Sequence, residues 1–429
     1  MSLRNEDRKE SLPYGAGEIS VRIPVKNYLE TIAPRFQPGT EDERGEILSA
    51  LHHPIGTPPL QEMARKGMKA VIVVNDATRP TPTYKLLPPL LEELEACGIP
   101  DLDIFMLVAT GTHRDTRPDE LEGLLGKEIL SRFRVINHHC QEKEGMVDLG
   151  ITSQGIPVII NRLFCEADLK ILTGSIEPHQ AAGFSGGRKS ILPGLASLES
   201  LRLHHGYGMR SPDPAMGWVE GNPFHLSAVE AAKKAGADFI LNVVQNHERE
   251  IIRAVAGDLE KAWLAGVQAS RKIFEVEAPE DVDIVITSPG GHPRDINLYQ
   301  SQKSMAAAEL VVKMGGTIIL PAACPDGVGS DGFYEWMDAA SCPKDVVERF
   351  IKEGYSLGAS KAWLYSRCLT KNELIVVSDS LDEKTLDDMF TQKAPSVEEA
   401  IEMALKKQGK DAKILVIKNA TDIVPKRKA

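Results

Sequence analysis

Short runs of apolar, often β-branched residues recur along the chain, and each is followed by a stretch with apolar residues at helical spacing. This alternation is typical of βα units around a parallel sheet. It predicts buried strands at Lys69–Asn75, Asp103–Ala109, Leu169–Thr173, Asp238–Val244, Asp283–Thr287 and Thr317–Leu320. It predicts helices at Leu90–Cys97, Phe224–Ala235, Leu259–Glu275, Ser301–Val312 and Pro343–Glu353. We therefore expect an α/β fold with mainly parallel sheets.

A polar segment containing a proline, residues 277–283, separates the helix ending at Glu275 from a new strand. Such segments mark domain boundaries. We expect an N-terminal α/β domain at 1–276 and a C-terminal one at 277–410, with an active-site cleft between them. Two more strands are predicted, at Glu373–Ser378 and Lys413–Ile417. The last strand, about 411–429, belongs to the second domain or returns to the first, and the final PKRKA is expected to fray.

Composition excludes several classes of partner. The 429 residues carry a net charge of −11, which disfavours binding to nucleic acid. No apolar run is long enough to span a membrane, and the first ten residues are too charged for a signal peptide, so we expect a cytoplasmic protein. The six cysteines form no CxxC pair, which predicts reduced thiols and no cysteine zinc site.

Candidate chemistry follows the predicted strands, where ligands bind in open α/β sheets. After the first strand come Asp76, Thr78 and Arg79, and an arginine fork can hold a carboxylate or phosphate. After the second comes His113, which can accept a proton from a hydroxyl near neutral pH. A capping aspartate paired with arginine, and a structural histidine, are the alternative interpretations.

The third loop combines His179 with a glycine-rich turn that contains Gly186, Gly187, Arg188 and Lys189. Backbone amides of such a turn can cradle an anion. It is not a P-loop, because arginine occupies the position that the Walker pattern gives to glycine. No GxGxxG follows a strand, so an ordinary nicotinamide site is unsupported. A purely structural turn remains the alternative.

Two later segments add candidates. His204 and His205 are adjacent, and on a helix adjacent side chains point about 100° apart, so one of them could face a metal. In the second domain, Tyr299, Gln300 and Lys303 follow a Gly-Gly turn, and the last two share a face if the segment is helical. A solvated helix face is the alternative here.

In their order along the chain, PIGTPPL, DATRPTP, ATGTHR, EPH, FSGGRKSILPG, LHH, YQSQK and GASKAW resemble the motifs of the nickel-pincer lactate racemase family (LarA-like proteins). The resemblance implies a racemase or epimerase of a small 2-hydroxy acid, lactate or a close relative. It also implies a nickel-pincer mononucleotide (nickel with pyridinium-3,5-bisthiocarboxylic acid mononucleotide) that is attached to a lysine and accepts a hydride reversibly. A hydride acceptor suits this substrate, because its carbon-bound hydrogen is not acidic enough to leave easily as a proton.

Carried over by motif, Lys189 would hold the cofactor and His205 would bind nickel, while His204 stands where relatives commonly have Asn. His113 and His179 would be bases on opposite sides of the substrate. The implied substrate contacts are Arg79, Tyr299, Gln300 and Lys303. The implied cofactor contacts are Asp76, which would also orient Arg79 or a histidine, Thr78, Gly186, Gly187, Arg188 and Trp363.

Other functions remain compatible with these residues. One is a racemase or 2-epimerase of a larger hydroxy acid, such as malate, an aryl-lactate or a sugar acid. Another is a nucleotide-binding phosphotransferase that uses the glycine-rich turn, and a third is a cofactor-free binding protein. The expected partners are a small 2-hydroxy acid and, transiently, the proteins that synthesise the pincer cofactor; homo-oligomerisation is left open.

Overall fold

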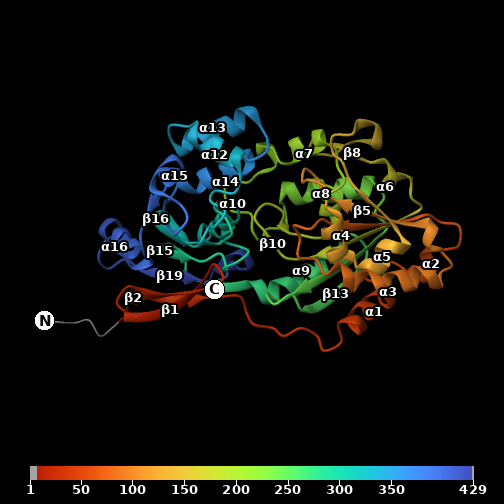
Figure 1. The fold of residues 1–429 in the computed structure, drawn as a ribbon, viewed down its shortest axis with the longest axis horizontal. Helices are drawn as coiled ribbons and strands as arrows, with labels where there is room; N and C mark the ends of the chain where they lie inside the picture. Colours follow the sequence, from red (N-terminus) through yellow and green to blue (C-terminus); the bar gives the residue numbers. More distant parts are fainter. Residues whose placement is uncertain (1–6, 428–429) are drawn as a thin grey trace. The chain divides into compact units, whose positions relative to one another are not determined.

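The computed structural model describes residues 7–427, which form two compact units, each built on a six-stranded sheet (Figure 1). The N-terminal unit comprises residues 36–210 and 217–273. The C-terminal unit comprises the chain up to Arg35, the segment 211–216 and the chain from Phe274 onward. Two α/β domains with mainly parallel sheets are thereby confirmed, and each unit is described here by itself.

The sheet of the N-terminal unit has the order β13-β12-β9-β4-β5-β6. Its strands are β4 (Ala70–Asn75), β5 (Ile104–Ala109), β6 (Arg134–Asn137), β9 (Leu169–Ser175), β12 (Phe239–Gln245) and β13 (Ile251–Gly257). All are parallel except β13, which runs antiparallel at the edge. The four predicted strands of this unit are confirmed to within two residues at each end.

The order of this sheet creates a topological switch point between β4 and β9. From β4 the chain continues to β5 and β6 on one side and then returns to β9 on the other. The loops that follow β4 and β9 therefore leave the sheet in opposite directions, which opens a crevice at its carboxyl edge. The predicted anion-binding and catalytic loops lie at this position.

The helices of the N-terminal unit bury apolar faces against the sheet. On one face, α1 (Glu43–His52) and α3 (Thr83–Ala96) share a core with alternate residues of β4, β5, β9 and β12. The others include α8 (Pro223–Lys234) and α9 (Lys261–Phe274). Helix α3 begins seven residues before the predicted start at Leu90. The predicted start was too late because Pro88 and Pro89, which lie inside the helix, usually interrupt a helical pattern.

The sheet of the C-terminal unit is parallel throughout, with the order β18-β17-β16-β15-β19-β3. Its strands are β3 (Tyr28–Ile32), β15 (Val282–Thr287), β16 (Val312–Pro321), β17 (Glu373–Val377), β18 (Gln392–Lys393) and β19 (Ile414–Ile417). Alternate residues of β15 enter opposite cores: Val285 belongs to one, and Ile284 and Ile286 belong to the other. A sheet buried on both faces explains why its strands read as continuous apolar runs.

Figure 1 shows what covers these two faces. Helices α12 (Asp331–Asp338), α13 (Pro343–Glu353) and α14 (Ala359–Leu369) pack on one. The hairpin of β1 (Asp7–Tyr14) and β2 (Gly17–Pro24), together with α16 (Val397–Gln408), packs on the other. The beginning and the end of the chain thus build one core.

Residues 7–35 belong to the C-terminal unit, whereas the sequence-based division at 276 placed them in the N-terminal domain. Strand β3 pairs with β19, with Ile32 opposite Ile417, so this segment joins the C-terminal unit. Strand β19 also stays in that unit. The expectation that PKRKA frays is wrong for its described part, because β20 (Val424–Arg427) pairs with β14 (Glu275–Ala278). Residues 428–429 lie outside the described residues.

A second correction concerns the predicted helix Ser301–Val312. Helical turns run through α10 (Leu298–Ser301) and α11 (Met305–Ala308), but Val312 already begins β16.

The remaining elements are α2 (Leu60–Met63), α4 (Pro118–Leu125), α5 (Lys127–Arg132), β7 (Met146–Ile151), β8 (Pro157–Asn161), α6 (Arg162–Glu166), β10 (Pro178–His179), β11 (Gly183–Phe184), α7 (Leu198–His204) and α15 (Glu383–Asp388).

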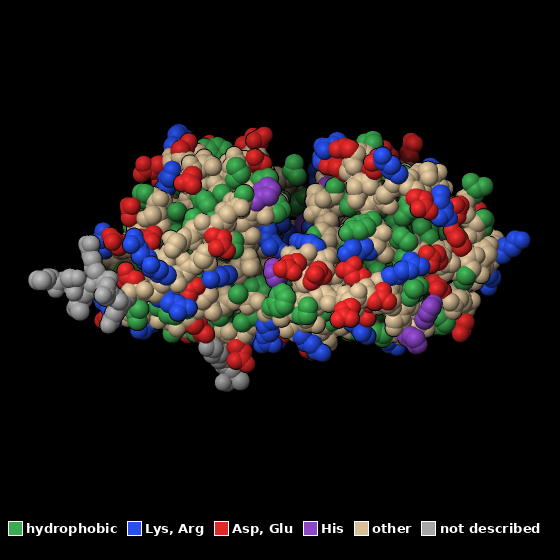
Figure 2. All heavy atoms as spheres, turned by 60° about the horizontal axis from the view of Figure 1, so that its bottom comes forward, with side chains coloured by type: hydrophobic (Ala, Val, Ile, Leu, Met, Phe, Trp, Pro, Cys, Tyr) green, Lys and Arg blue, Asp and Glu red, His purple; other side chains and the backbone are tan. Residues whose placement is uncertain are grey.

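The surface agrees with the composition. Figure 2 shows acidic and basic side chains interspersed over one face, without a broad basic region there. Among residues 7–427, none of the helices is both long enough and apolar enough to cross a membrane. All six cysteines are free thiols, as predicted.

Candidate functional site

Two predicted site residues meet where β4 and β5 end. Asp76 directly follows β4, and its Oδ2 lies 3.1 Å from Nδ1 of His113, which follows β5. Its Oδ1 accepts hydrogen bonds from the backbone amide and the hydroxyl of Thr78, at 2.7 and 2.5 Å. Asp76 is 3% exposed, whereas the His113 side chain is 42% exposed. A buried carboxylate therefore holds an accessible imidazole at the carboxyl edge of the sheet.

The Asp76 carboxyl group is ionised in this setting. Burial by itself raises its pKa, but the hydrogen bond and charge of His113, the charge of Arg79 and the Thr78 hydroxyl outweigh burial and lower the pKa to about 2. An ionised carboxylate only accepts hydrogen bonds, so Nδ1 of His113 carries the proton between them. When the ring carries no second proton, Nε2 presents a lone pair that can accept one.

Asp76 should make the stability of the protein depend on pH. Its pKa is depressed from about 3.9, so its contribution is complete above pH 4 and is lost as the pH falls through about 2. We expect Asp76→Asn to lower the free energy of unfolding by about 2 kcal/mol at pH 7. This difference from wild type should shrink below pH 4, as measured by urea unfolding.

Asp115→Asn is a matched control for that experiment, because it breaks an exposed pair with His139, whose Nε2 lies 3.0 Å from Asp115 Oδ1. Exposed pairs contribute about 0–1 kcal/mol. If the two substitutions lowered the free energy of unfolding equally, burial and the contacts of Asp76 would not account for its contribution.

His179 lies on β10, which pairs with β11 in a small hairpin after β9. Its Nδ1 accepts hydrogen bonds from the backbone amides of Ala181 and Ala182, both at 3.1 Å. Burial, together with the positive charges of Lys189, Arg79, Arg210 and Arg188, holds its pKa well below the ordinary value. The ring is therefore neutral at pH 7.

The glycine-rich turn closes around Asn242, a residue of β12. The Oδ1 atom of Asn242 accepts the backbone N–H of Gly187 at 2.8 Å. Gly186 has a φ of +80°, and a Cβ placed there would lie 2.7 Å from Asn242 Oδ1 and 2.9 Å from the carbonyl oxygen of Ser175. Only glycine fits this conformation at such close approach.

Gly186→Ala should therefore destabilise the protein by about 2–4 kcal/mol, combining the cost of positive φ with that of overpacking. Gly126→Ala is the matched control, since Gly126 has a similar φ of +86° but open space where a Cβ would stand. We expect the control to cost about 1–2 kcal/mol, from its backbone alone. Chemical denaturation of the two variants measures the difference, and equal losses would contradict the packing argument.

Arg188 holds this turn from inside. Its side chain is fully buried, and it donates to the carbonyl oxygens of Ser185 and Gly186 at 3.1 Å, to that of Ala182 at 2.9 Å, and to Nδ1 of His225 at 3.1 Å. Burial lowers its pKa to about 9, so it remains charged at pH 7. Its observed contacts are with the protein itself, and its predicted contact with a cofactor stays a prediction.

His204 and His205 end α7 in different surroundings. His204 is fully buried, its Nε2 donates to the carbonyl oxygen of Phe224 at 2.9 Å, and burial lowers its pKa to about 3. His205 caps the helix and is partly exposed, and burial with neighbouring positive charges also keeps its pKa well below the ordinary value. Of the two neutral rings, His205 is the one that a ligand can reach.

The remaining predicted residues belong to the C-terminal unit. Tyr299 and Gln300 lie on α10, and Lys303 follows in a 3₁₀ turn, so the segment is helical as the sequence suggested. Trp363, in contrast, is 1% exposed and stacks on Phe350 in the core, with ring centroids 5.6 Å apart. Packing accounts for Trp363, and its predicted contact with a cofactor stays a prediction.

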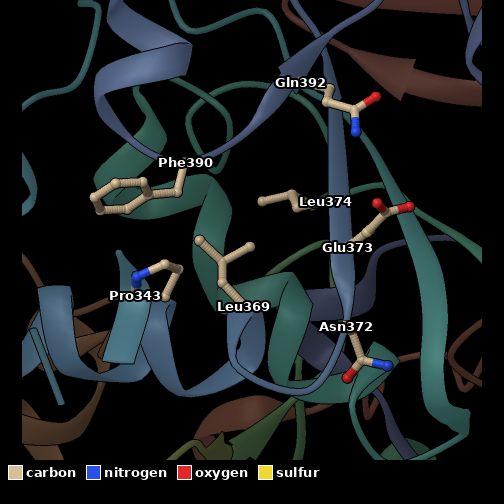
Figure 3. Close-up of a pocket in the computed structure, with 7 residues that line it drawn as sticks. All are labelled: Pro343, Leu369, Asn372, Glu373, Leu374, Phe390 and Gln392. Carbon is tan, nitrogen blue, oxygen red and sulfur yellow. The ribbon is translucent and has the colours of Figure 1, made fainter. Parts of the chain in front are cut away.

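None of the predicted site residues lines the pocket described in this unit. It has a volume of about 190 Å³, and Figure 3 shows its lining: Pro343, Leu369, Asn372, Glu373, Leu374, Phe390 and Gln392. Glu373 forms an ion pair with Lys407.

Sequence reasoning missed three residues that contact predicted site residues or their neighbours within each unit. In the N-terminal unit, Asn242 and His225 support the glycine-rich turn. Lys361 is buried, with its Nζ 4.7 Å from the centre of the Tyr299 ring and 3.4 Å from Oε1 of Gln302. The sequence offered a clue to Lys361, because this residue lies inside the GASKAW motif. The clue to Asn242 was weaker: it is a polar residue in the middle of an apolar strand.

Known proteins resemble this chain along nearly its whole length. Two family models match: the lactate racemase N-terminal domain at residues 14–217 and the lactate racemase C-terminal domain at residues 277–424. The lactate racemase of Thermoanaerobacterium thermosaccharolyticum is 37% identical over 97% of this chain and 99% of its own length. That of Lactiplantibacillus plantarum is 36% identical over the same shares.

Solved structures agree with these matches. The lactate racemase apoprotein from T. thermosaccharolyticum superposes with a TM-score of 0.91 at 36% identity, covering 98% of this chain and all of the other. A protein from Thermotoga maritima shares the fold, with a TM-score of 0.67 at 21% identity, over 92% of this chain and all of the other. The two domain matches and the full-length relatives show that the chain belongs to the lactate racemase family.

Proposed function

We propose that this protein is an isomerase that racemises lactate, or a closely related small 2-hydroxy acid, by reversible hydride transfer. The observation that carries the proposal is the pair of Asp76 and His113 at the switch point, in a chain whose full-length relatives are named lactate racemases. A carboxylate that fixes an imidazole leaves Nε2 available as a base for a hydroxyl proton.

The N-terminal unit offers groups that fit a nickel-pincer mononucleotide. Lys189 lies in the glycine-rich turn and is partly exposed, and a lysine amine can form a covalent link to a cofactor. His205 is neutral at pH 7, and the neutral imidazole is the form that binds a metal. Residues 7–427 contain no group of three or more His, Cys, Asp or Glu side chains that could hold a metal ion. On the family resemblance, His205 would be the protein ligand that completes the nickel site of the cofactor.

The charges around this site suit anionic ligands. Arg79, Arg188, Lys189 and Arg210 all act on His179, and all four are positive. Such a cluster can attract a mononucleotide phosphate to a protein of net charge −11, and the three arginines keep their charge for a substrate carboxylate once Lys189 is linked. Nucleotide phosphate transfer would use the same charges, but the family assignment favours the racemase.

Each group then has a proposed task. When bound, the cofactor would accept the hydride from C2 of the substrate and return it. His113 and His179 handle the hydroxyl proton, and Arg79 binds the carboxylate. Tyr299, Gln300 and Lys303 are proposed to bind substrate oxygens, and Thr78, Gly187 and Trp363 to contact the cofactor, on the family motifs.

Loading with cofactor is proposed to require transient contact with the proteins that synthesise it. The test is to produce the chain with and without those proteins and to measure intact mass and nickel content. Single enantiomers of lactate, malate and phenyllactate are then followed for loss of optical activity. We expect an adduct, bound nickel and racemisation of lactate only after co-production. An adduct without racemisation of any of these acids would overturn the proposal.

A further inference from the structure

The turn between β1 and β2, residues 14–17, lies at the carboxyl edge of the C-terminal sheet. Ser288, directly after β15, donates from its hydroxyl to the carbonyl oxygen of Pro13 at 2.8 Å. Asp379, which follows β17, accepts the hydroxyl of Tyr14 at 2.9 Å. Ligands usually bind at this edge of an open α/β sheet, and here the beginning of the chain covers part of it.

Asp295 joins this turn to two neighbouring loops. Its side chain is fully buried, and Oδ2 accepts the backbone amide of Gly15 at 2.7 Å and that of Ala323, which follows β16, at 3.2 Å. Its own amide donates to the carbonyl oxygen of Gly291 at 3.1 Å, and its carbonyl oxygen accepts the amide of Cys324 at 2.8 Å. One residue thus connects the hairpin turn, the Gly-Gly turn and the loop after β16.

The residues that follow Asp295 carry the predicted substrate contacts. Asn297 caps α10, because its Oδ1 accepts the amide of Gln300 at 2.9 Å. The amide of Tyr299 donates to the carbonyl oxygen of Val328, in the loop after β16, at 3.0 Å. Helix α10 has only four residues, so its position depends on such external bonds rather than on its own hydrogen bonds.

The carboxyl group of Asp295 is the acceptor that keeps this arrangement together. A backbone N–H can only donate, and the amides of Gly15 and Ala323 both use Oδ2 of this one side chain. A side chain without an acceptor would leave both amides unpaired in a largely buried place, which is costly. The loop that begins α10 would then lose its bond to the hairpin turn.

We infer that Asp295 is a positioning residue for substrate binding. By fixing α10 and the 3₁₀ turn after it, it holds Tyr299, Gln300 and Lys303 where they bind substrate oxygens. The inference rests on the proposed racemase function, and it gives the hairpin at the beginning of the chain a task in that function. Asp295 acts through the helix, because its own carboxyl group is bonded to backbone amides.

Steady-state kinetics of the loaded variants give the first test. Asp295→Ala should raise KM for lactate roughly tenfold, the effect of losing one or two buried hydrogen bonds. The value of kcat should change much less, since a loss of binding that is equal in ground and transition states appears in KM alone. Asp295→Asn keeps an oxygen acceptor of the same reach, so its KM should stay within about threefold of wild type. An unchanged KM in Asp295→Ala would overturn the inference.

Asp283→Ala is the matched control. Asp283 lies on β15 in the same unit, and its Oδ2 also accepts a backbone amide, that of Lys413, at 2.8 Å. This bond lies at the amino end of the sheet rather than at its carboxyl edge. The control should lose stability but keep the wild-type KM. An equal rise of KM in both variants would reduce Asp295 to a purely structural role and would overturn the inference.

Hydrogen exchange of the cofactor-free protein, measured by mass spectrometry, gives a readout besides activity. Peptides covering residues 298–304 should exchange at least about tenfold faster in Asp295→Ala than in wild type or in Asp283→Ala. Tyr14→Phe removes the hydroxyl that binds Asp379 and loosens the hairpin turn from its other side. If Asp295→Ala does not fold, the same peptides should exchange faster in Tyr14→Phe. Unchanged exchange in the variant that folds would overturn the inference.

The proposed function and the role of Asp295 fail separately. A loaded wild-type protein that racemises no 2-hydroxy acid contradicts the proposed function, whatever the exchange of residues 298–304 shows. An active racemase in which Asp295→Ala leaves KM and this exchange unchanged contradicts only the role of Asp295.

Discussion

His113→Gln is expected to lower the rate of lactate racemisation by roughly 10²- to 10⁴-fold while nickel and cofactor content stay at the wild-type level. The side chain is accessible, and its Nδ1 is bonded to a carboxylate whose pKa is about 2. Glutamine fills similar space but has no nitrogen that can accept a proton at neutral pH. The measurement is the initial rate of loss of optical activity per nickel bound.

His139→Gln is the matched control. His139 belongs to the same unit, its side chain is 43% exposed, and its Nε2 lies 3.0 Å from a carboxylate oxygen of Asp115. The two histidines thus share exposure and an acidic partner, but only the partner of His113, Asp76, follows β4 at the switch point. We expect the control to keep wild-type activity. A large loss in both variants, or in neither, would contradict the role of His113.

Asp76 extends the same argument. Its carboxylate sets the tautomer of His113 and stabilises the cation that forms when the ring accepts a proton, so Asp76→Asn should slow racemisation even though the imidazole remains. The pH dependence of its stability effect then serves as an independent check that the carboxylate is ionised in the folded protein.

The local pattern of the sequence predicted most strands but could not predict which strands pair. Runs such as AVIVVN and IFMLVA are buried on both faces and have a strong local signal. The hairpin of β1 and β2 has a weaker one, since only Leu12, Val21 and Ile23 of its residues enter the core. The hairpin packs against residues of β15, β16, β17 and β19, and the next strand, β3, pairs with β19, nearly 400 residues away; no local pattern contains such contacts.

For the site, the sequence predicted which polar residues follow the ends of the strands, but it could not predict the hydrogen bonds that these residues form. Position after a strand was enough to select Asp76, His113 and His179. The nitrogen that each histidine offers depends on backbone amides and on a carboxylate brought close by folding. Arg188 shows the same limit, because an arginine beside a lysine suggested a ligand, whereas its donors are used by carbonyl groups of its own turn.

Lys189→Arg should abolish racemisation and leave a protein of unmodified mass after co-production with the cofactor-synthesis proteins. Arginine keeps the positive charge that Lys189 exerts on His179 and His205. Its guanidinium stays protonated and is a poor nucleophile, so it cannot replace the amine in a covalent link. The backbone bonds of Lys189, from its amide to Gly186 and from Gly194 to its carbonyl oxygen, do not depend on the side chain, so the turn should persist.

Lys170→Arg is the matched control for this substitution. Lys170 lies on β9 of the same sheet and is partly exposed like Lys189, but it stands before the carboxyl edge rather than beyond it. The control should carry the adduct, bind nickel and racemise lactate at the wild-type rate. An adduct mass on the Lys189→Arg variant would place the covalent link on another residue. Racemisation by that variant without an adduct would show that the reaction does not need the link, and either result would contradict the role assigned to Lys189.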